Sequence, residues 1–388
     1  MTAFKEKTLS TYMPHKPYST TEGYGYRESS NDLRRGDMVS RGFLYLPFLG
    51  FVAAYSLIVY GIAVVNGLED LLRFGLYSPL ASLFLIVLLV CCVSLITYLT
   101  IRTGLEKEPR PVKRVYLEFG RIVGLKGAAE VIVSIVAISI FNACFTSFKA
   151  MIGVLNPFHL DPLLARIDQA FHGGIPPWEI THSIVTSLGG TFVVDTLYAS
   201  WVLVLWGFLI WNVLRLRNPV ARQQFLLAYV LSWGVMGSLL AYVLSSAGPC
   251  YYGPVTGLED IYAPLMERLH KMDEGLAAYG KWYAIKALDG QEWLWSHYTA
   301  AKVKAGAGIS AMPSMHVSFA VLFALSAWQV SRVFGIIMAA YAFFVLFGSV
   351  HLGWHYAIDG YLAIPLSMGV WWFSGCVASR FSRHGSVS

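Results

Sequence analysis

The sequence predicts an all-α integral membrane protein with about eight transmembrane helices. Hydrophobic residues make up 56% of the 388 residues and charged residues only 13%, about half the share in an average soluble domain. Together with a mean hydropathy of +0.55, this composition excludes a soluble globular protein, a disordered chain and a disulfide-rich scaffold. The net charge of +6 does not indicate nucleic-acid binding, because membrane proteins sort Lys and Arg to one side of the bilayer.

A helix needs about 20 residues to cross a bilayer, and eight apolar stretches reach or approach this length. Only Ser331 and Arg332 separate the sixth stretch from the seventh, which predicts a tight helical hairpin. The polar segment 1–42, which precedes the first stretch, is expected to be a flexible tail. The expected spans are 43–65, 78–101, 128–148, 196–214, 225–247, 313–330, 333–350 and 356–377.

The distribution of Lys and Arg predicts the orientation. Of the 29 such residues, 20 lie in segments that alternation places on one side, although the other side holds the two longest loops. The positive-inside rule makes the first side cytoplasmic, so loops 149–195 and 248–312 lie outside. We expect both termini in the cytoplasm and the protein in a plasma (inner) membrane. The cation-rich segments are 1–42, 102–127, 215–224, Arg332 and the C-terminal tail 378–388.

The first outer loop contains a predicted amphipathic helix, which we expect to lie on the membrane surface. Asp161 precedes Pro162, a pattern typical of a helix cap followed by proline at the first helical position. The second outer loop is rich in Trp and Tyr, which suits the membrane interface. The apolar stripe of the amphipathic helix consists of Leu160, Leu163, Leu164, Ile167 and Phe171.

Two clusters of residues can carry chemistry, and the span count places both at the same membrane face. One is the segment 313–316, which ends in His316; the other is 351–359. His355 and Asp359 share a helix face, so the carboxylate can hold Nδ1–H and leave Nε2 free as a nucleophile or base. His316 follows Pro-Ser at a helix start, where an anion is favoured. The combination predicts phosphoryl transfer through a phosphohistidine, with one histidine attacking and the other protonating the leaving oxygen.

At these residues the sequence resembles the type-2 phosphatidic acid phosphatase superfamily, whose motifs are Pro-Ser-Gly-His and Ser-Arg-x5-His-x3-Asp. The resemblance implies a catalytic core of six helices, 128–377, preceded by two extra helices and a cytoplasmic loop, 43–127. It also implies that His355 is the nucleophile, Asp359 its partner and His316 the acid. Ser314 matches the motif serine and is expected to contact substrate.

The departures from the phosphatase motifs resemble the inositol phosphorylceramide synthase branch. Met315 replaces the motif glycine and Ser349 replaces the motif arginine, while Gly-Pro-Cys-Tyr-Tyr at 248–252 stands where the first motif should lie. The loop 149–178 resembles the same branch. The resemblance implies an enzyme of sphingolipid metabolism that moves a phosphoinositol-like head group to a lipid hydroxyl. Its partners would be the donor and acceptor lipids, with no cofactor and no metal.

Five further residues are candidates for substrate binding. Lys149 either contacts phosphate in place of the missing arginines or snorkels from the outer end of the third span. His351 is either a phosphate contact or an interfacial histidine, and Lys302 either guides substrate or is a solvated loop charge. Tyr251 and Tyr252 belong either to a ligand-binding segment or to a strained turn.

Three alternatives to phosphotransfer remain at this stage. Because water and a lipid alcohol attack the same phosphohistidine, a phosphatase acting on a lipid phosphate or polyprenyl pyrophosphate uses the same residues. His351, His355 and Asp359 also have the spacing of a metal-binding helix face, although no other acidic or cysteine cluster lies nearby. A transporter could use the histidines and Asp359 as a proton relay, but the sequence shows no inverted repeat. The donor, the acceptor and the oligomeric state do not follow from the sequence.

Overall fold

The computed structural model describes residues 29–122, 124–215 and 217–384, and these contain helices and no strands. The long helices are α1 (Ser29–Asn66), α2 (Ser78–Leu105), α4 (Leu125–Leu155), α15 (Arg332–His351) and α16 (Ala357–His384). Shorter ones are α3 (Pro111–Ile122), α5 (Asp161–Phe171), α6 (Pro177–Ile184), α7 (Leu188–Ala199), α8 (Trp201–Leu214), α9 (Pro219–Leu231), η2 (Ser232–Leu240), α10 (Ala241–Val243), α11 (Tyr252–Thr256), α12 (Ala263–Ala277), α13 (Lys286–Thr299) and α14 (Met315–Trp328). Three single turns, η1 (Glu69–Leu71), η3 (Pro249–Tyr251) and η4 (Lys281–Tyr283), complete the set.

Seven helical segments of the described chain are long and apolar enough to cross a membrane, which confirms the predicted fold class. They are Leu44–Asn66, Ser78–Leu105, Gly127–Leu155, Leu188–Leu214, Pro219–Val243, Arg332–His351 and Ala357–Arg383. The sixth predicted span, 313–330, forms only the 14-residue helix α14. At 1.5 Å per residue α14 is about 21 Å long, short of the hydrocarbon thickness of about 30 Å. It packs between α15 and α16 as a buried helix of the bundle.

The helices extend beyond several predicted boundaries. α1 begins at Ser29 and α16 continues to His384, so the predicted tails 1–42 and 378–388 are partly helical; residues 1–28 and 385–388 lie outside the described chain. The predicted cytoplasmic loop 102–127 contains the helix α3. Hydropathy marks only the membrane-buried part of a helix, whereas polar residues can continue the same hydrogen-bonded helix outside the bilayer.

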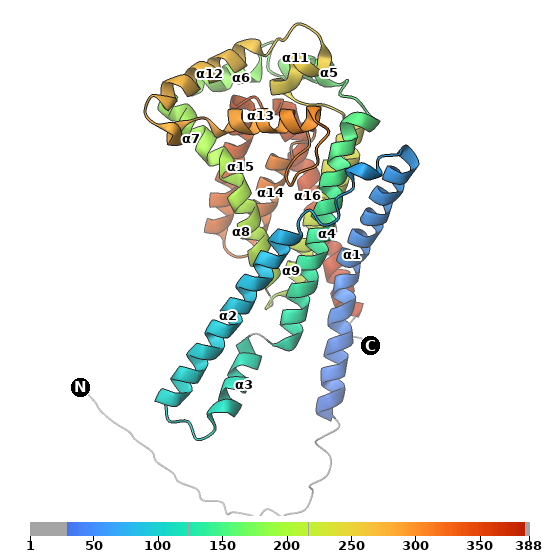
Figure 1. Ribbon diagram of the computed structural model, residues 1–388, viewed down its shortest axis with the longest axis vertical. Coiled ribbons are helices and arrows are strands. Elements are labelled where there is room, and N and C mark those ends of the chain that lie inside the picture. The colour runs from blue at the N-terminus through green and yellow to red at the C-terminus, as the bar shows by residue number, and fades with distance from the viewer. Residues whose placement is uncertain (1–28, 123, 216, 385–388) are drawn as a thin grey trace, which may run out of the picture.

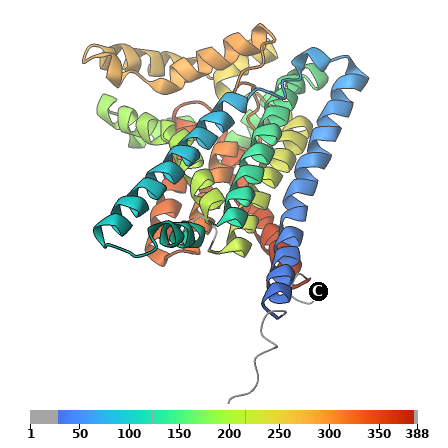
Figure 2. The same cartoon turned by 60° about the horizontal axis from the view of Figure 1, so that its bottom comes forward.

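The bundle has a packed centre and a helix that stands apart. α14 packs against α15 and α16, α9 packs against α16, and α1 packs against α4, α9 and α16 (Figures 1 and 2). α2 packs against α3 and α4, and in its most apolar stretch no residue is buried. The other helices therefore form a packed core, whereas α2 lies at its edge and is not buried in its most apolar stretch.

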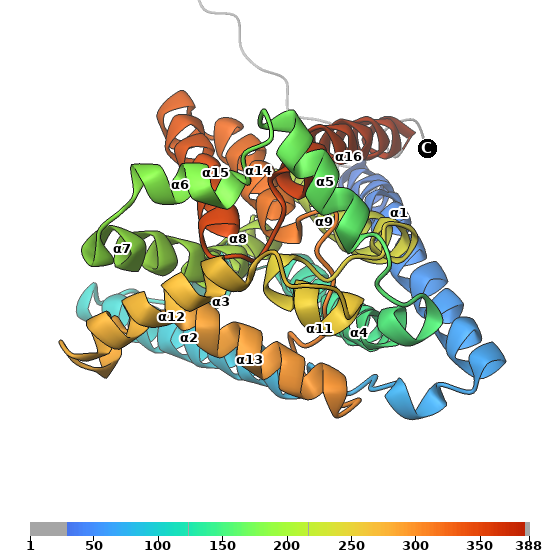
Figure 3. The ribbon, with the colours of Figure 1, turned by 90° about the horizontal axis from the view of Figure 1, so that it is seen from above.

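A helical cap covers one end of the bundle. It consists of α5, α6, α11, α12 and α13 and lies at the opposite end from α3 (Figure 1); Figure 3 shows it from above. These helices come from the two predicted outer loops, 149–195 and 248–312. The sequence motifs of both histidines lie beneath the cap, so the cap and the bundle together enclose the region expected to carry chemistry.

Buried aspartates fasten the cap to the bundle through backbone amides. Asp161 accepts hydrogen bonds from the amides of Ala247 and Gly248, both at 2.9 Å, and from the hydroxyl of Tyr356 at 2.9 Å. Its predicted role as the cap of its own helix is wrong, because α5 begins at Asp161 and Leu160 is the capping residue. A buried carboxylate is stabilised by several donors at once, and chain segments distant in sequence supply them here.

The buried face of α5 contains acidic residues as well as part of the predicted apolar stripe. Asp161 and Asp168 are buried together with Leu164, whereas Leu163 is 43% and Phe171 75% exposed. The apolar residues that remain exposed can contact the membrane surface, as expected from the sequence. The two carboxylates, seven residues apart on one helix face, point into the protein and organise the cap.

Candidate active site

A cavity of about 630 Å³ lies beneath the cap, at the end of the bundle nearest to it. This volume is within the range of about 300–1,000 Å³ that is typical of small-molecule sites. His316 and His355 both line the cavity, as do Lys149 and Tyr251. The walls come from the start of α2, from α4, α8, α9, η2, α13 and the start of α14, and from the turn that precedes α16 and the loop 305–310. The structure therefore brings together the two histidine motifs that the sequence places 39 positions apart.

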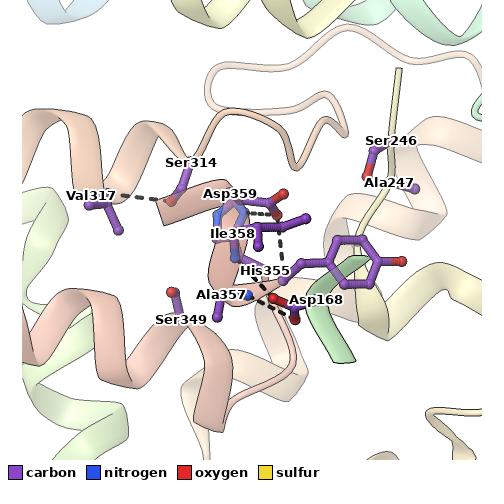
Figure 4. Close-up of polar contacts among 12 residues, drawn as sticks. Asp168, Ser246, Ala247, Ser314, Val317, Ser349, His355, Ala357, Ile358 and Asp359 are labelled. Atoms are coloured by element: carbon purple, nitrogen blue, oxygen red, sulfur yellow. Dashed lines mark hydrogen bonds and ion pairs between the residues drawn. The ribbon is translucent and has the colours of Figure 1, made fainter. Parts of the chain in front are cut away.

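His355 is held by Asp359 in the way the sequence predicts. Nδ1 of His355 lies 3.3 Å from Oδ2 of Asp359, which also accepts the amide of Tyr356 at 3.0 Å (Figure 4). Asp359 is fully buried. A carboxylate at Nδ1 favours the tautomer with Nδ1–H, which leaves the lone pair on Nε2. His355 can then act as a nucleophile toward a group in the cavity.

The turn between α15 and α16 fixes the backbone of His355. The amides of Trp354 and His355 both donate to the carbonyl of Ser349, at 2.9 and 3.1 Å. Gly353 has φ of +75°, a left-handed conformation that side-chain-bearing residues rarely adopt. Ser349 is buried, and its carbonyl serves as the anchor of this turn.

Asp168 of α5 caps the helix that follows His355. Its two carboxylate oxygens accept the amides of Ala357 and Ile358, both at 3.1 Å (Figure 4). These are the first residues of α16, where free N–H groups and the helix dipole favour negative charge. Burial nevertheless raises the pKa of Asp168 to about 6, because desolvation outweighs the two amide hydrogen bonds.

His316 lies on the first turn of α14 in an aromatic setting. Its ring lies 4.9 Å from that of Tyr198 and 4.4 Å from that of Trp201, centroid to centroid. The indole of Trp201 also donates to the carbonyl of His316 at 3.0 Å. The rings of His316 and His355 are 5.8 Å apart, with an interplanar angle of 63°. Two imidazoles thus face one cavity from different elements, a separation that suits reaction with a group between them.

Lys149 lies six residues before the end of α4, which continues to Leu155. The expectation that Lys149 ends the third span is therefore wrong. Its side chain lines the cavity, and within the described residues it makes no ion pair. The loop 305–310 packs against it, and a Cβ added at Gly308 would lie 2.8 Å from Cγ of Lys149. Gly308 also has φ of +106°, so glycine is required there for both space and conformation.

The loop beside Lys149 offers backbone donors. Among the described contacts, the amides of Gly308, Ile309 and Ser310 donate to no protein group. Ile309 is buried and its two neighbours are partly buried. Consecutive N–H groups without a protein acceptor, in a glycine-containing loop, can bind an anion.

The other expected substrate ligands lie in different settings. Ser314 is buried and caps α14, its hydroxyl accepting the amide of Val317 at 3.4 Å (Figure 4). Tyr251 lines the cavity, and its hydroxyl donates to the carbonyl of Gln291. Tyr252 is buried against Tyr262 outside the cavity lining. Lys302 is exposed and does not line the cavity.

His351 faces away from the cavity. Its Nε2 lies 3.1 Å from the hydroxyl of Thr191, and its ring stacks on that of His182 at 3.9 Å. His351 ends α15 and Asp359 belongs to α16, so the helix face proposed for a metal is interrupted by the turn. Among the described residues no group of three or more His, Cys, Asp or Glu is placed to hold a metal.

The aromatic wall around His316 was not identified from the sequence. The His316 ring is surrounded by Tyr198 of α7, Trp201 of α8 and Trp354 of the turn before α16. A Trp or Tyr in or beside an apolar span carries no sign of which direction it faces. The role of Asp168 was missed for a similar reason. Its position off the apolar stripe of α5 marked it as polar, but only the fold shows that the polar face is the buried one.

Comparison with known proteins identifies one family. The family profile described as PAP2 superfamily matches residues 163–373, more than half of the chain. The match includes His316, His355 and Asp359 and leaves α1 to α4, with Lys149, outside. No curated protein and no solved structure gives a significant match to the chain.

Proposed function

Since the chain belongs to the PAP2 superfamily, we propose that it is a lipid phosphotransferase of this superfamily. Membership supports phosphatase or phosphotransferase chemistry on lipid phosphoesters. Our finer proposal is transfer of a phosphorylated head group, of the phosphoinositol type, from one lipid to the hydroxyl of another. The observation that carries the phosphoryl-transfer chemistry is the pair of histidines in one cavity, with His355 oriented by Asp359 and the rings 5.8 Å apart.

In the first half-reaction, Nε2 of His355 attacks the phosphorus of the donor lipid. An N–P bond forms, the P–O bond to the lipid alcohol breaks, and the electron pair leaves with that oxygen. Protonated His316 gives its proton to the oxygen, so a neutral alcohol departs. Asp359 keeps the proton at Nδ1 of His355 and stabilises the positive charge that develops on the ring.

In the second half-reaction, the hydroxyl of the acceptor lipid attacks the same phosphorus. The N–P bond breaks, an O–P bond forms, and His316, now neutral, takes the hydroxyl proton. Both histidines return to their starting states. If water attacks in place of the lipid hydroxyl, the same steps give hydrolysis, so the acceptor decides between transferase and phosphatase.

Lys149 and the loop 305–310 are suited to the negative charge of the phosphoryl group. Ser349 stands where the phosphatases of the resemblance have an arginine, and it is buried in α15 and does not line the cavity. Lys149 lines the same cavity as both histidines, and the free amides of the loop lie beside it. We propose that these groups supply the electrostatic stabilisation that arginines supply elsewhere in the family.

Two substitutions test the assignment of the histidines. His355→Ala should abolish turnover of both lipid and aryl phosphoesters, because no covalent intermediate can form. His316→Ala should lose about 10²–10⁴-fold on lipid substrates, whose alkoxide needs a proton, yet retain much more activity on an aryl phosphate, whose phenolate leaves unaided. The opposite pattern would reverse the two roles, and equal loss on both substrates would remove the division of labour.

The products and the metal requirement separate the remaining alternatives. Purified protein with a phosphoinositol lipid and a lipid alcohol should form the transferred phosphodiester, detected by mass spectrometry, in the presence of EDTA. Release of a water-soluble phosphorylated head group alone would show a hydrolase. Activity lost in EDTA and restored by zinc would show a metal enzyme, and uptake into vesicles without phosphoester cleavage would show a transporter.

A further inference from the structure

A narrow apolar groove continues from the catalytic cavity between α2, α4 and α8. It has a volume of about 210 Å³, and four residues line both it and the cavity: Tyr77, Leu80, Asn142 and Trp206. The groove is therefore an extension of the active site, and it leads away from the histidines along the helices.

The walls of the groove are almost entirely apolar. From α2 come Phe84, Val87 and Leu88, and from α8 come Leu209 and Val213. On α4 the lining runs from Asn142 to Val131, which at 1.5 Å per residue is about 16 Å. One leaflet of a hydrocarbon core about 30 Å thick has about this depth. The length and the chemistry both match a hydrocarbon chain.

α2 closes the groove without filling it. Its Phe84 lies 6.2 Å from Trp206 of α8, ring centroid to ring centroid. Yet no residue in the most apolar stretch of α2 is buried by the rest of the protein. In a membrane, an apolar helix face that protein does not cover is covered by lipid chains, so the gap between α2 and the bundle is a place for hydrocarbon.

The end of the groove nearest the histidines is tied to the loop that lies beside Lys149. The hydroxyl of Tyr77 accepts the amide of Gly306 at 3.2 Å and lies 3.1 Å from the hydroxyl of Thr146. Lys149 is one helical turn beyond Thr146 on α4. A phosphoryl group beside Lys149 would therefore have its attached lipid chain at the mouth of the groove.

We propose that this groove binds a hydrocarbon tail of the lipid substrate and makes α2 a determinant of tail length. The proposal rests on the function proposed above. It commits to the substrate tail because the groove shares lining residues with the cavity of His316 and His355, which a groove for a bystander lipid would not need. α2 lies outside the region matched by the family profile, 163–373, so this wall is an addition to the family core.

The first test fills the groove and compares a long-chain lipid substrate with an aryl phosphate, which has no tail. Ser139→Trp on α4 and Ala81→Trp on α2 place an indole in the groove, whereas Val136→Trp, on an exposed face of α4, is the matched control. A phosphoinositol lipid with 16-carbon tails, assayed with a lipid alcohol as acceptor, should show a KM at least about tenfold higher in both filled variants, which corresponds to lost burial of about two methylene groups. An aryl phosphate should keep its kcat/KM within about twofold in all three. Equal behaviour of filled and control variants on the long-chain lipid would overturn the proposal.

The second test does not depend on turnover. Wild-type protein in detergent is irradiated with a phosphoinositol lipid that carries a diazirine at the end of one tail, and adducts are mapped by mass spectrometry. Adducts on groove residues of α2, α4 and α8 should be displaced by unlabelled long-chain lipid and not by its six-carbon analogue. If adducts form on the groove residues and long-chain lipid displaces them, but no phosphoester is turned over, the proposed function is rejected and the groove remains a binding site for a lipid tail. Turnover with adducts confined to the outer helix faces, or not displaced by long-chain lipid, would reject the groove and keep the function.

Discussion

At the scale of single residues, Lys149 is the cation that we propose binds the phosphoryl charge. It lines the cavity of the two histidines, and Gly308 makes room for its stem. A lysine ammonium acts on phosphate as a point charge, whereas an arginine binds it with a planar fork. We propose that this point charge and the backbone donors of the loop 305–310 bind the phosphoryl group.

Removal of the Lys149 charge should weaken catalysis. Lys149→Met should lower kcat/KM for a phosphoester by about tenfold to a hundredfold, the loss expected for a hydrogen bond to a charged group, and Lys149→Arg should restore part of it. Lys302→Met, a matched change at an exposed lysine outside the cavity, should leave kcat/KM within about twofold. Steady-state kinetics with an aryl phosphate measure the effect. Wild-type activity in Lys149→Met would remove Lys149 from the site.

At the scale of elements, helix starts are capped by carboxylates from elsewhere in the chain. Asp168 binds the first two amides of α16, and Asp195 binds the amides of Lys286 and Ala287 at the start of α13, at 3.0 and 2.9 Å. Each contact joins two elements through the backbone. Asp168 binds the backbone next to His355 and does not line the cavity, so we propose that it positions His355 and Asp359.

The raised pKa of Asp168 predicts a pH dependence of stability. The carboxyl titrates at about 6 in the folded protein and near 3.9 when unfolded, so between these values the folded state binds more protons than the unfolded state. Stability from this group is therefore full below about pH 4, declines as pH rises to about 6, and is constant above. The difference in apparent Tm between wild type and Asp168→Asn should fall by several degrees from pH 4 to 6.5. A flat difference, or one that rises with pH, would contradict the shifted pKa.

At the scale of the whole molecule, the span pattern and the histidine motifs were accessible from the sequence, and their surroundings were not. Apolar stretches report what a bilayer solvates, so they predicted a helical membrane protein and placed His316 near His355. The apolar stretches did not show that α14 is too short to cross the membrane alone, because the placement of α14 depends on its packing between α15 and α16. They also did not show that His351 turns toward His182, since a position next to a motif does not fix the direction of a side chain.

The orientation of the whole protein in the membrane is also a prediction: the cap lies outside the cell and α3 inside. In a chain with its native cysteines replaced, a cysteine at the exposed position of Ser296 on α13 should react with a membrane-impermeant reagent in intact cells. A cysteine at the exposed position of Arg110, between α2 and α3, should react only after permeabilisation. Gel-shift labelling distinguishes the two. The reverse pattern would place the cap and the histidines in the cytoplasm.

The position of the cavity also determines the units in which the substrate concentration of this enzyme should be expressed. Val202 lines the cavity and is half exposed on the bundle surface, and the cap covers the end that would otherwise open to bulk water. Substrates that stay in the bilayer then meet the enzyme by diffusion in two dimensions, at a concentration set by their mole fraction among the lipids. Dilution of the substrate with inert lipid would slow the reaction, whereas dilution of the whole suspension with buffer would leave the rate per enzyme unchanged.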